Sequence, residues 1–177
     1  MNSKEGYKFS SACEGEESVH VEFRKCNPAR EISALRSFDR KVFSKGDLFT
    51  ASEWRQYTSY WMILGGTVIG CCAFEHNVDF QEDLRNDESN QQLEGSLYIA
   101  STGILPSHQG KGLGRLLKSW EITYAKYHGF TRIVTNTRKK NRQMISLNRK
   151  FGFQIIRETR GYYSNPSDST VVMELKL

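Results

Sequence analysis

The strongest constraint on the fold is a strand-to-helix junction in the second half of the chain. Residues 96–105 have strand character and stop at Pro106, and a glycine-rich turn follows, Gln109-Gly110-Lys111-Gly112-Leu113-Gly114. Beyond it, apolar side chains recur at i, i+3, i+4, i+7 and i+11, as on a helix that covers a core. These residues are Leu113, Leu116, Leu117, Trp120 and Tyr124. The junction predicts an α/β chain in which a strand runs through this turn into a helix.

The rest of the chain alternates strand and helix patterns around this junction. Alternating and short apolar runs predict strands at 19–25, 60–64, 68–74, 131–136, 153–157 and 171–175. Apolar residues at helical spacing predict helices that begin at Pro28, after Thr50 and after Asn141. We therefore expect an α/β fold with a mixed, mostly antiparallel central sheet of about six to seven strands and helices on both faces.

Capping residues and glycines mark the ends of several predicted elements. Thr50 and Glu53 have the spacing of a capping box, and Gly65-Gly66 is a hairpin signal. Asn141 is placed to cap the last helix. The apolar stripe expected on that helix consists of Met144, Leu147 and Phe151.

Length and composition favour one domain without a membrane segment. With 177 residues, 38% of them hydrophobic, the chain suits one sizeable core. We expect residues 1–18 to be a flexible N-terminal tail and residues 19–177 to form the domain. No apolar run approaches the roughly 20 residues that span a bilayer. The four cysteines show neither disulfide-framework spacing nor a CxxC pair, so we expect a cytoplasmic protein with no metal site.

The glycine-rich turn is a candidate anion-binding site. Glycines let the backbone approach a ligand closely, and the first turn of a helix offers unpaired N–H groups and the positive end of its dipole. Lys111 and Arg115 add positive charge to a chain of net charge +5. A P-loop would carry Lys and Ser or Thr after its last glycine, and a dinucleotide site would need GxGxxG spacing. Neither pattern is present, and an ordinary, tightly capped turn is the alternative.

Two stretches of the chain together resemble one known family. Residues 101–117 (STGILPSHQGKGLGRLL) resemble the acetyl-CoA motif of the GNAT superfamily of N-acetyltransferases, a strand followed by Q/R-x-x-G-x-G/A and a helix. Residues 141–153 (NRQMISLNRKFGF) resemble the family's later helix, N-x-x-x-x-x-L-Y-x-x-x-G-F. The flanking elements extend the resemblance over nearly the whole chain after Val19. It implies a GNAT-like fold and the use of acetyl-CoA.

The resemblance also implies which residues hold acetyl-CoA. Backbone groups at the end of the strand would bind the pantetheine arm like an added strand, and N–H groups of the turn would hold the pyrophosphate. These residues are Thr102, Gly103, Ile104, Leu105, Gln109, Gly110, Lys111, Gly112, Leu113, Gly114 and Arg115. Asn141 would contact the amide arm of the cofactor. The strands at 96–105 and 131–136 would diverge to admit it.

The catalytic residues depart from the family pattern at one position. Asn148 stands where the family often has a tyrosine that protonates the leaving thiolate, and an amide can donate a hydrogen bond but no proton. A thiol near pKa 8.5 leaves as a thiolate at a cost of roughly 2 kcal/mol at pH 7. Asn148 therefore remains a candidate that hydrogen-bonds the sulfur or the acceptor, with a solvated helix residue as the alternative.

The sequence identifies the general base and the acceptor-binding residues less specifically. Glu75 and His76 are neighbours at the end of a strand, so at most one of them faces a site that must deprotonate an amine. Tyr162 and Tyr163 either line the acceptor pocket or cover the sheet edge. Residues 81–95 are acidic, and two of them would favour a cationic amine if this stretch covers the acceptor. These two are Asp87 and Glu88.

The sequence thus predicts an N-acetyltransferase that moves the acetyl group of acetyl-CoA to a primary amine of a small molecule or peptide by direct attack. Residues 161–173 also resemble protein N-terminal acetyltransferases of the bacterial ribosomal-protein type, but the Glu of that group corresponds to Asn136 here, so we do not adopt that substrate. A catalytically silent acyl-CoA-binding sensor or interaction module is the alternative. The basic run 138–142 lacks interleaved aromatics, which argues against a nucleic-acid partner. The sequence leaves open whether the protein forms a homodimer.

Overall fold

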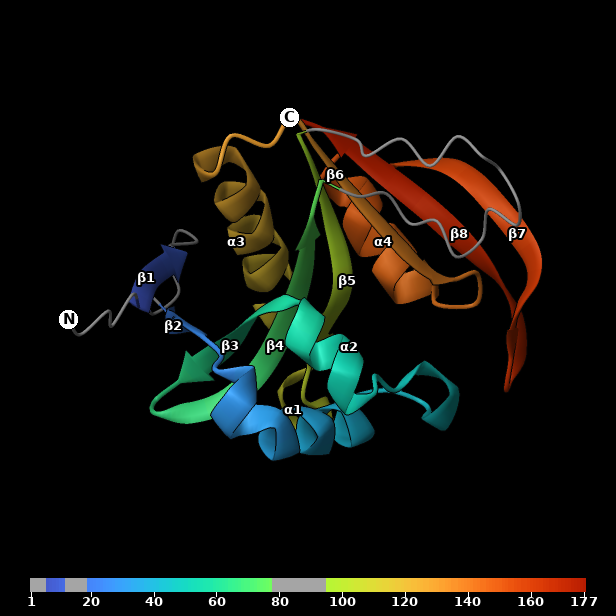
Figure 1. Cartoon of the computed structure of the whole chain (residues 1–177). Helices are drawn as coiled ribbons and strands as arrows, with labels where there is room; N and C mark the ends of the chain where they lie inside the picture. The colour runs from blue at the N-terminus through green and yellow to red at the C-terminus, as the bar shows by residue number, and fades with distance from the viewer. Residues whose placement is uncertain (1–5, 12–18, 78–94) are drawn as a thin grey trace. The chain divides into compact units, whose positions relative to one another are not determined.

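The computed structural model describes residues 6–11, 19–77 and 95–177, and these form eight strands, four α-helices and two short 3-10 helices (Figure 1). The strands are β1 (Gly6–Ser11), β2 (Val19–Lys25), β3 (Thr58–Leu64), β4 (Thr67–His76), β5 (Ser96–Ile104), β6 (Arg132–Arg138), β7 (Gln154–Ser164) and β8 (Ser167–Lys176). The helices are α1 (Pro28–Val42), α2 (Ala51–Gln56), α3 (Leu113–Tyr127) and α4 (Arg142–Lys150), with η1 (Lys45–Asp47) and η2 (Pro106–His108) as the 3-10 turns. Among the described residues, no helix is long and apolar enough to cross a membrane.

The strands form one mixed sheet in the order β1-β2-β3-β4-β5-β6-β8-β7, which confirms the expected α/β class. β5 and β6 run parallel, whereas β1–β2, β2–β3, β6–β8 and β7–β8 are antiparallel. The additional strand relative to the expected six or seven is β1, which pairs with β2. Residues 6–11, which the sequence analysis assigned to an N-terminal tail, pair with β2 as a strand.

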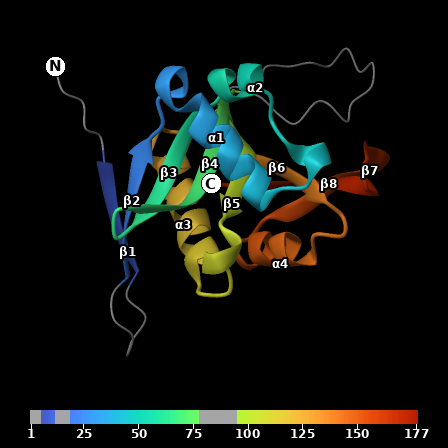
Figure 2. The ribbon, with the colours of Figure 1, turned by 90° about the horizontal axis from the view of Figure 1, so that it is seen from below.

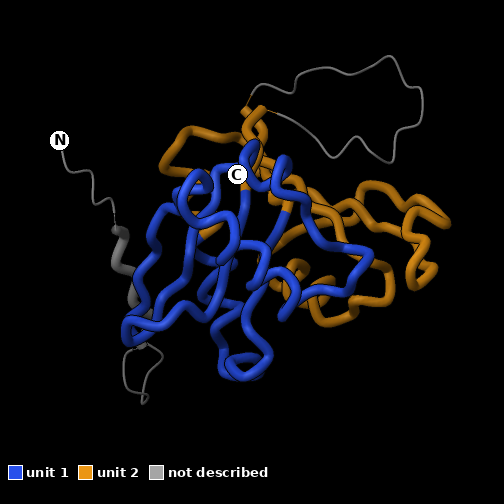
Figure 3. Tube along the Cα trace, turned by 60° about the horizontal axis from the view of Figure 1, so that its bottom comes forward, with its two compact units in different colours: residues 1–73, 101–120 blue, residues 74–100, 121–177 orange. Residues whose placement is uncertain are grey.

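The described chain divides into two compact units (Figure 3). Unit 1 consists of Met1–Ala73 and Ser101–Trp120, and unit 2 of Phe74–Ala100 and Glu121–Leu177. The division passes through β4, β5 and α3, so each of these elements contributes residues to both units.

Unit 1 carries helices on both faces of its strands, as the sequence predicted. β1, β2 and β3 lie side by side (Figure 2). Trp61 of β3 packs edge-on against Phe38 of α1 with ring centroids 5.6 Å apart, while its neighbour Tyr60 packs against Trp120 of α3 at 5.0 Å. Adjacent residues on a strand point to opposite faces. α1 and α3 therefore cover opposite faces of β3.

The connection from α1 to α2 is held by a buried carboxylate. Asp39 is only 2% exposed, and its Oδ2 accepts hydrogen bonds from the backbone N–H of Phe49 at 2.9 Å and from Trp54 Nε1 at 3.2 Å. Burial raises the pKa of Asp39 to about 6, because the charged form is poorly solvated there. The predicted capping box at the start of α2 is confirmed, with reciprocal side-chain and backbone bonds between Thr50 and Glu53.

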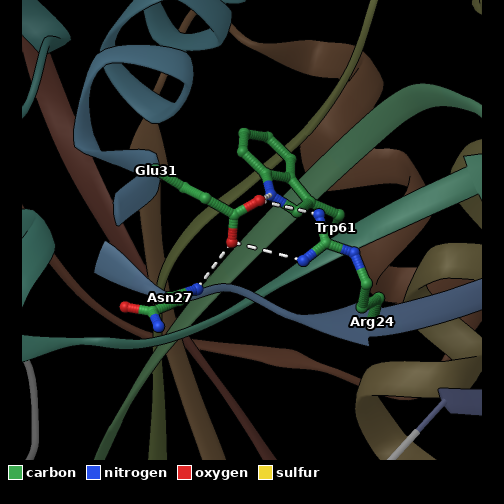
Figure 4. A network of polar contacts seen from close by, with 4 residues as sticks. All are labelled: Arg24, Asn27, Glu31 and Trp61. Atoms are coloured by element: carbon green, nitrogen blue, oxygen red, sulfur yellow. Dashed lines mark hydrogen bonds and ion pairs between the residues drawn. The ribbon is translucent and has the colours of Figure 1, made fainter. Parts of the chain in front are cut away.

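The first turn of α1 is tied to two strands through Glu31 (Figure 4). Its carboxylate accepts hydrogen bonds from Arg24 Nη2 of β2 at 2.7 Å, from Trp61 Nε1 of β3 at 3.2 Å and from the backbone N–H of Asn27 at 2.7 Å. The hydrogen bond from Arg24 is the largest cause that holds the pKa of Glu31 below its usual value of 4.5, against the opposing effect of burial. One carboxylate thus fixes where α1 begins on the sheet.

In unit 2, β6 is paired on both sides, but not over the same length. Its parallel pairing with β5 ends at Ile99↔Thr135, whereas its antiparallel pairing with β8 continues to Arg138↔Thr170. β5 and β6 both run on beyond their last common pair. This register is what the predicted divergence of the two strands requires.

Glu31 is expected to contribute stability that depends on pH. Because its pKa is lowered in the folded state, the carboxylate stabilises the fold above the unfolded pKa near 4.5, and this contribution is lost as the pH falls through the folded-state value. We expect Glu31→Gln to lower the free energy of unfolding by about 1–2 kcal/mol at pH 7, a value that allows for the partly exposed Arg24, and by less at pH 3. Urea denaturation at both pH values measures this. The exposed Glu22→Gln on β2 is the control and should change little; an equal loss in both variants would contradict the role of the network.

Candidate functional site

The carboxyl end of β5 and the start of α3, both in unit 1, form the first half of the candidate site. Gly103 lies under the end of α1, and a Cβ at this position would approach Val42 Cγ1 to 2.6 Å and Phe43 Cζ to 3.0 Å. A glycine is therefore required here for packing, a constraint that no local sequence pattern indicates. The Gln109 side chain donates a hydrogen bond from Nε2 to the carbonyl oxygen of Ile104 at 2.9 Å. This bond fixes the glycine-rich turn to the strand end.

Two glycines give the turn its shape. Gly110 and Gly112 have φ angles of +77° and +75°, in the left-handed region that favours glycine. A Cβ at either position would have no heavy atom within 4 Å, so the turn presents bare backbone to open space. The carbonyl of Gly112 accepts from the N–H of Arg115 at 2.9 Å and so begins the ladder of α3. A ligand can thus approach the backbone here without displacing a side chain.

The N–H groups at this helix start have no acceptor in the part of the chain that the structure describes. Among the described residues, no hydrogen bond is found from the backbone N–H groups of residues 110–114. Lys111 and Arg115 are exposed beside them. His108, in the same turn, has its Nδ1 3.0 Å from Ser107 Oγ. Unpaired N–H groups, a helix dipole and two cations together suit a phosphate.

The apolar stripe of α3 is confirmed, but the one predicted on α4 is displaced by one position. Leu113, Leu116, Leu117, Trp120 and Tyr124 are all buried. On α4 the buried residues are Ile145 and Asn148, while Met144, Leu147 and Phe151 are only partly buried. The sequence prediction followed the larger apolar side chains, whereas the orientation of the helix buries the face with Ile145 and Asn148.

Asn148, the residue in the family's tyrosine position, lies in the interior of unit 2. It is 1% exposed, and its Nδ2 donates to Met173 Sδ on β8 at 3.6 Å. Its Oδ1 has no partner among the described residues. The alternative of a solvated helix residue is therefore wrong. Asn141 caps α4 as predicted, since its Oδ1 accepts from the N–H of Met144 at 3.1 Å.

A cluster of phenols gathers around Asn136 on β6, a residue that was not among the predicted site residues. Asn136 Oδ1 accepts from the Tyr98 hydroxyl at 2.7 Å, and its Nδ2 donates to the Tyr163 hydroxyl at 3.2 Å and to Thr170 Oγ1 at 3.4 Å. Tyr162 packs edge-on against Tyr163 and against the apolar residues around Tyr98. A polar residue in the inward-facing register of a predicted strand was the signal that could have identified Asn136.

Glu75 and His76 diverge at the end of β4, as neighbours on a strand must. The His76 ring packs against Phe130 at a centroid distance of 5.1 Å, and its Nε2 lies 3.5 Å from the Tyr124 hydroxyl of α3. Phe74, on the same face, stacks on Tyr124. His76 therefore belongs to an aromatic cluster next to α3, and Glu75, which is half-buried, points to the other face of β4.

The basic run after β6 is used to hold the β7–β8 hairpin. Arg138 donates from Nη1 and Nη2 to the carbonyl oxygens of Pro166 and Asn165, and its guanidinium lies 4.0 Å from the centre of the Tyr163 ring. Lys139 pairs with Glu158 at 2.6 Å. Arg138 and Lys139 of the basic run thus have structural contacts with this hairpin. The predicted acidic loop, with Asp87 and Glu88, lies outside the described residues.

The cysteines offer no exposed nucleophile among the described residues. Cys26, Cys71 and Cys72 are free and buried. Burial raises the pKa of the Cys71 thiol well above its ordinary value, which disfavours the nucleophilic thiolate.

Comparison by sequence identifies a family. Residues 26–153 match the model of the acetyltransferase (GNAT) family. The match spans both the glycine-rich turn and α4. A search of curated proteins found none that matches this chain.

Solved structures share the fold at low sequence identity. The ribosomal-protein-S18-alanine N-acetyltransferase from Escherichia coli superposes with a TM-score of 0.70 at 15% identity, over 88% of this chain and 93% of that one. NAA60 from Arabidopsis thaliana, solved with acetyl-CoA, gives 0.70 at 17% identity, over 89% and 98%. The putative acetyltransferase yncA from Salmonella typhimurium, also with acetyl-CoA, gives 0.66 at 21% identity, over 89% and 94%. At these identities the similarity shows the fold.

Substitution of Asn148 on α4 and of Asn141, which caps the helix, should change the free energy of unfolding in opposite directions. Asn148→Leu removes a buried carbonyl oxygen that has no partner among the described residues, and it also removes a weak hydrogen bond to the Met173 sulfur. Because the first effect is the larger, we expect the free energy of unfolding to rise by up to about 1 kcal/mol. Asn141→Ala removes a cap and should lower it by about 1 kcal/mol. Urea denaturation of both variants measures the difference. A clear destabilisation by Asn148→Leu would mean that Oδ1 has a bound partner in solution.

Proposed function

Because the chain belongs to the acetyltransferase (GNAT) family, we propose that it transfers the acetyl group of acetyl-CoA to a primary amine. The single observation that carries this proposal is the start of α3, where two left-handed glycines leave the N–H groups of residues 110–114 open and without acceptors among the described residues. Structures with the same fold that were solved with acetyl-CoA or CoA support the choice of co-substrate.

The residues that would hold acetyl-CoA are those of the strand end and the turn. The pyrophosphate would accept hydrogen bonds from the N–H groups of residues 110–114, with Lys111 and Arg115 beside it. The pantetheine arm would lie along the backbone of residues 102–105, and Asn141 would contact it. The cradle fits, because a Cβ at Gly110 or Gly112 would occupy otherwise open space.

The reaction requires the chain to favour the deprotonated amine and to polarise the thioester carbonyl. When bound, acetyl-CoA supplies a thioester whose carbonyl carbon the amine attacks. An alkylammonium near pKa 10.4 is protonated at pH 7, and its deprotonation costs roughly 4–5 kcal/mol, so the site must favour the neutral amine. Backbone N–H groups of residues 102–104 would polarise the thioester carbonyl.

No protein nucleophile is needed in this scheme. The buried cysteines, with Cys71 held as a thiol, do not favour a covalent enzyme intermediate. Asn148 is buried against Met173, and leaving-group protonation by the enzyme can be dispensed with at a cost of roughly 2 kcal/mol. Direct attack by the amine therefore remains the proposed route. Glu75 and His76 stay candidates for the base, and Tyr162 and Tyr163 for acceptor binding.

A catalytically silent acyl-CoA-binding module is the second candidate. Burial of Asn148 and its inability to donate a proton favour it. If the protein is an enzyme, its acceptor is a small molecule or a peptide. Both proposals are compatible with a cytoplasmic location.

Acetyl-CoA binding and turnover separate these proposals. Titration calorimetry with acetyl-CoA should give binding, and thiol release with amino acids, polyamines, aminoglycosides and peptide N-termini should identify an acceptor. Gly112→Glu places a strained, negatively charged residue at the turn and should weaken binding at least tenfold. The control is Gly129→Glu, because Gly129 also has φ +75° and open space around its missing Cβ, but lies after α3.

Binding without thiol release would favour the silent module. No binding by the unmodified protein, or equal binding by both glycine variants, would contradict the assignment of the turn.

A further inference from the structure

The end of α1 packs directly on the strand end that is proposed to hold acetyl-CoA. A Cβ at Gly103 of β5 would lie 2.6 Å from Val42 Cγ1, and 3.0 and 3.5 Å from Phe43 Cζ and Cε2. The first two distances are shorter than van der Waals contact, so the space that a side chain at 103 would need is already filled. All three residues belong to unit 1, and Phe43 is half-buried. An aromatic ring therefore covers this face of β5 at residue 103.

Gly103 lies between two backbone groups of the proposed site. The N–H of Leu105 donates to the carbonyl oxygen of Ile69 on β4 at 2.8 Å, so this N–H faces β4. Successive N–H groups of a strand alternate between its two edges. We therefore expect the N–H groups of Thr102 and Ile104 to point to the opposite edge, where the thioester carbonyl would accept from them. An acyl group held there lies beside Gly103 and next to the ring that covers it.

The position of Phe43 is fixed by Asp39. Phe43 leaves α1 with φ −114° and ψ 159°, and its N–H donates to the carbonyl oxygen of Asp39 at 2.8 Å. The Asp39 carboxylate accepts in turn from the N–H of Phe49 at 2.9 Å and from Trp54 Nε1 at 3.2 Å. Both ends of residues 43–49 are thus tied to one buried residue. Because these hydrogen bonds oppose its displacement, the ring cannot easily move aside for a ligand.

We propose that Phe43 limits the acyl group that the protein accepts to about the size of acetyl. This inference rests on the proposed acetyltransferase function and specifies the acyl-CoA that the same site takes. An acetyl group ends in one methyl group, whereas a butyryl group carries two further methylenes. Those methylenes would extend from the thioester toward the space that the ring occupies. Phe43 is thus a specificity-determining residue for the acyl donor, and no proton transfer is assigned to it.

Titration calorimetry with CoA, acetyl-CoA and butyryl-CoA tests the role of Phe43 without knowledge of the acceptor amine. The wild-type protein should bind butyryl-CoA at least tenfold more weakly than acetyl-CoA, because one methylene already changes discrimination by roughly tenfold or more in a closed apolar site. Phe43→Ala removes the ring and should bring these two dissociation constants within about threefold of each other. The affinity for CoA, which carries no acyl group, should change by less than about threefold.

Phe49→Ala is the matched control. Phe49 is a half-buried ring of the same connection from α1 to α2, and it packs against Trp54 and Tyr57 at centroid distances of 5.4 and 5.1 Å. None of its atoms is among the three nearest to the missing Cβ of Gly103. The variant should therefore keep the preference for acetyl-CoA. If Phe43→Ala fails to fold, Phe43→Leu serves instead, because it shortens the side chain but keeps it apolar, and it should lower the preference at least about threefold.

The result for Phe43 can be told apart from the result for the proposed function. Equal binding of acetyl-CoA and butyryl-CoA by the wild-type protein would overturn the role of Phe43, and so would an unchanged preference in its variants or an equal loss of preference in Phe49→Ala. The predicted preference without thiol release would support the size limit in an acyl-CoA-binding module that is not an enzyme. If the wild-type protein binds neither CoA nor acetyl-CoA, the proposed function fails and this inference fails with it.

Discussion

The proposed acetyl-CoA site depends on a short stretch of main chain in which φ is positive at Gly110 and again at Gly112. That alternation turns the backbone between η2 and α3, and the successive N–H groups there have no acceptor within residues 6–11, 19–77 and 95–177. Any residue with a Cβ would be strained at these positions and would fill the space in front of the amides. The bond from Gln109 to Ile104 then fixes this cradle to the end of β5.

The chemistry that follows is mostly that of uncharged groups. The thioester would be held by backbone amides, and the cluster around Asn136 consists of phenols, an amide and a hydroxyl, with Arg138 as its cation. Two carboxylates serve the fold instead: Glu31 fixes the start of α1, and Asp39 joins its end to α2. This division separates residues that set stability from those proposed to act on the acceptor.

Much of the fold could be predicted from local signals. β2, α1, the capping box of α2, the stripe of α3 and the glycine-rich turn were all marked by periodicity or by capping chemistry. β1 was missed, because its pairing with β2 is a tertiary contact that composition does not reveal. The orientation of α4 was also missed, since packing and not side-chain size buries Asn148. The hydrogen-bond partners of Asn136 and the packing around Gly103 involve residues distant in the sequence, so no local pattern predicts them.

Amide hydrogen exchange, followed residue by residue with and without acetyl-CoA, tests the central claim most directly. The proposed binding mode predicts that the N–H groups of residues 110–114 exchange fast in the free protein and become protected on binding, together with those of residues 102–104. Protection confined to other parts of the chain, with these amides unchanged at saturating acetyl-CoA, would contradict it.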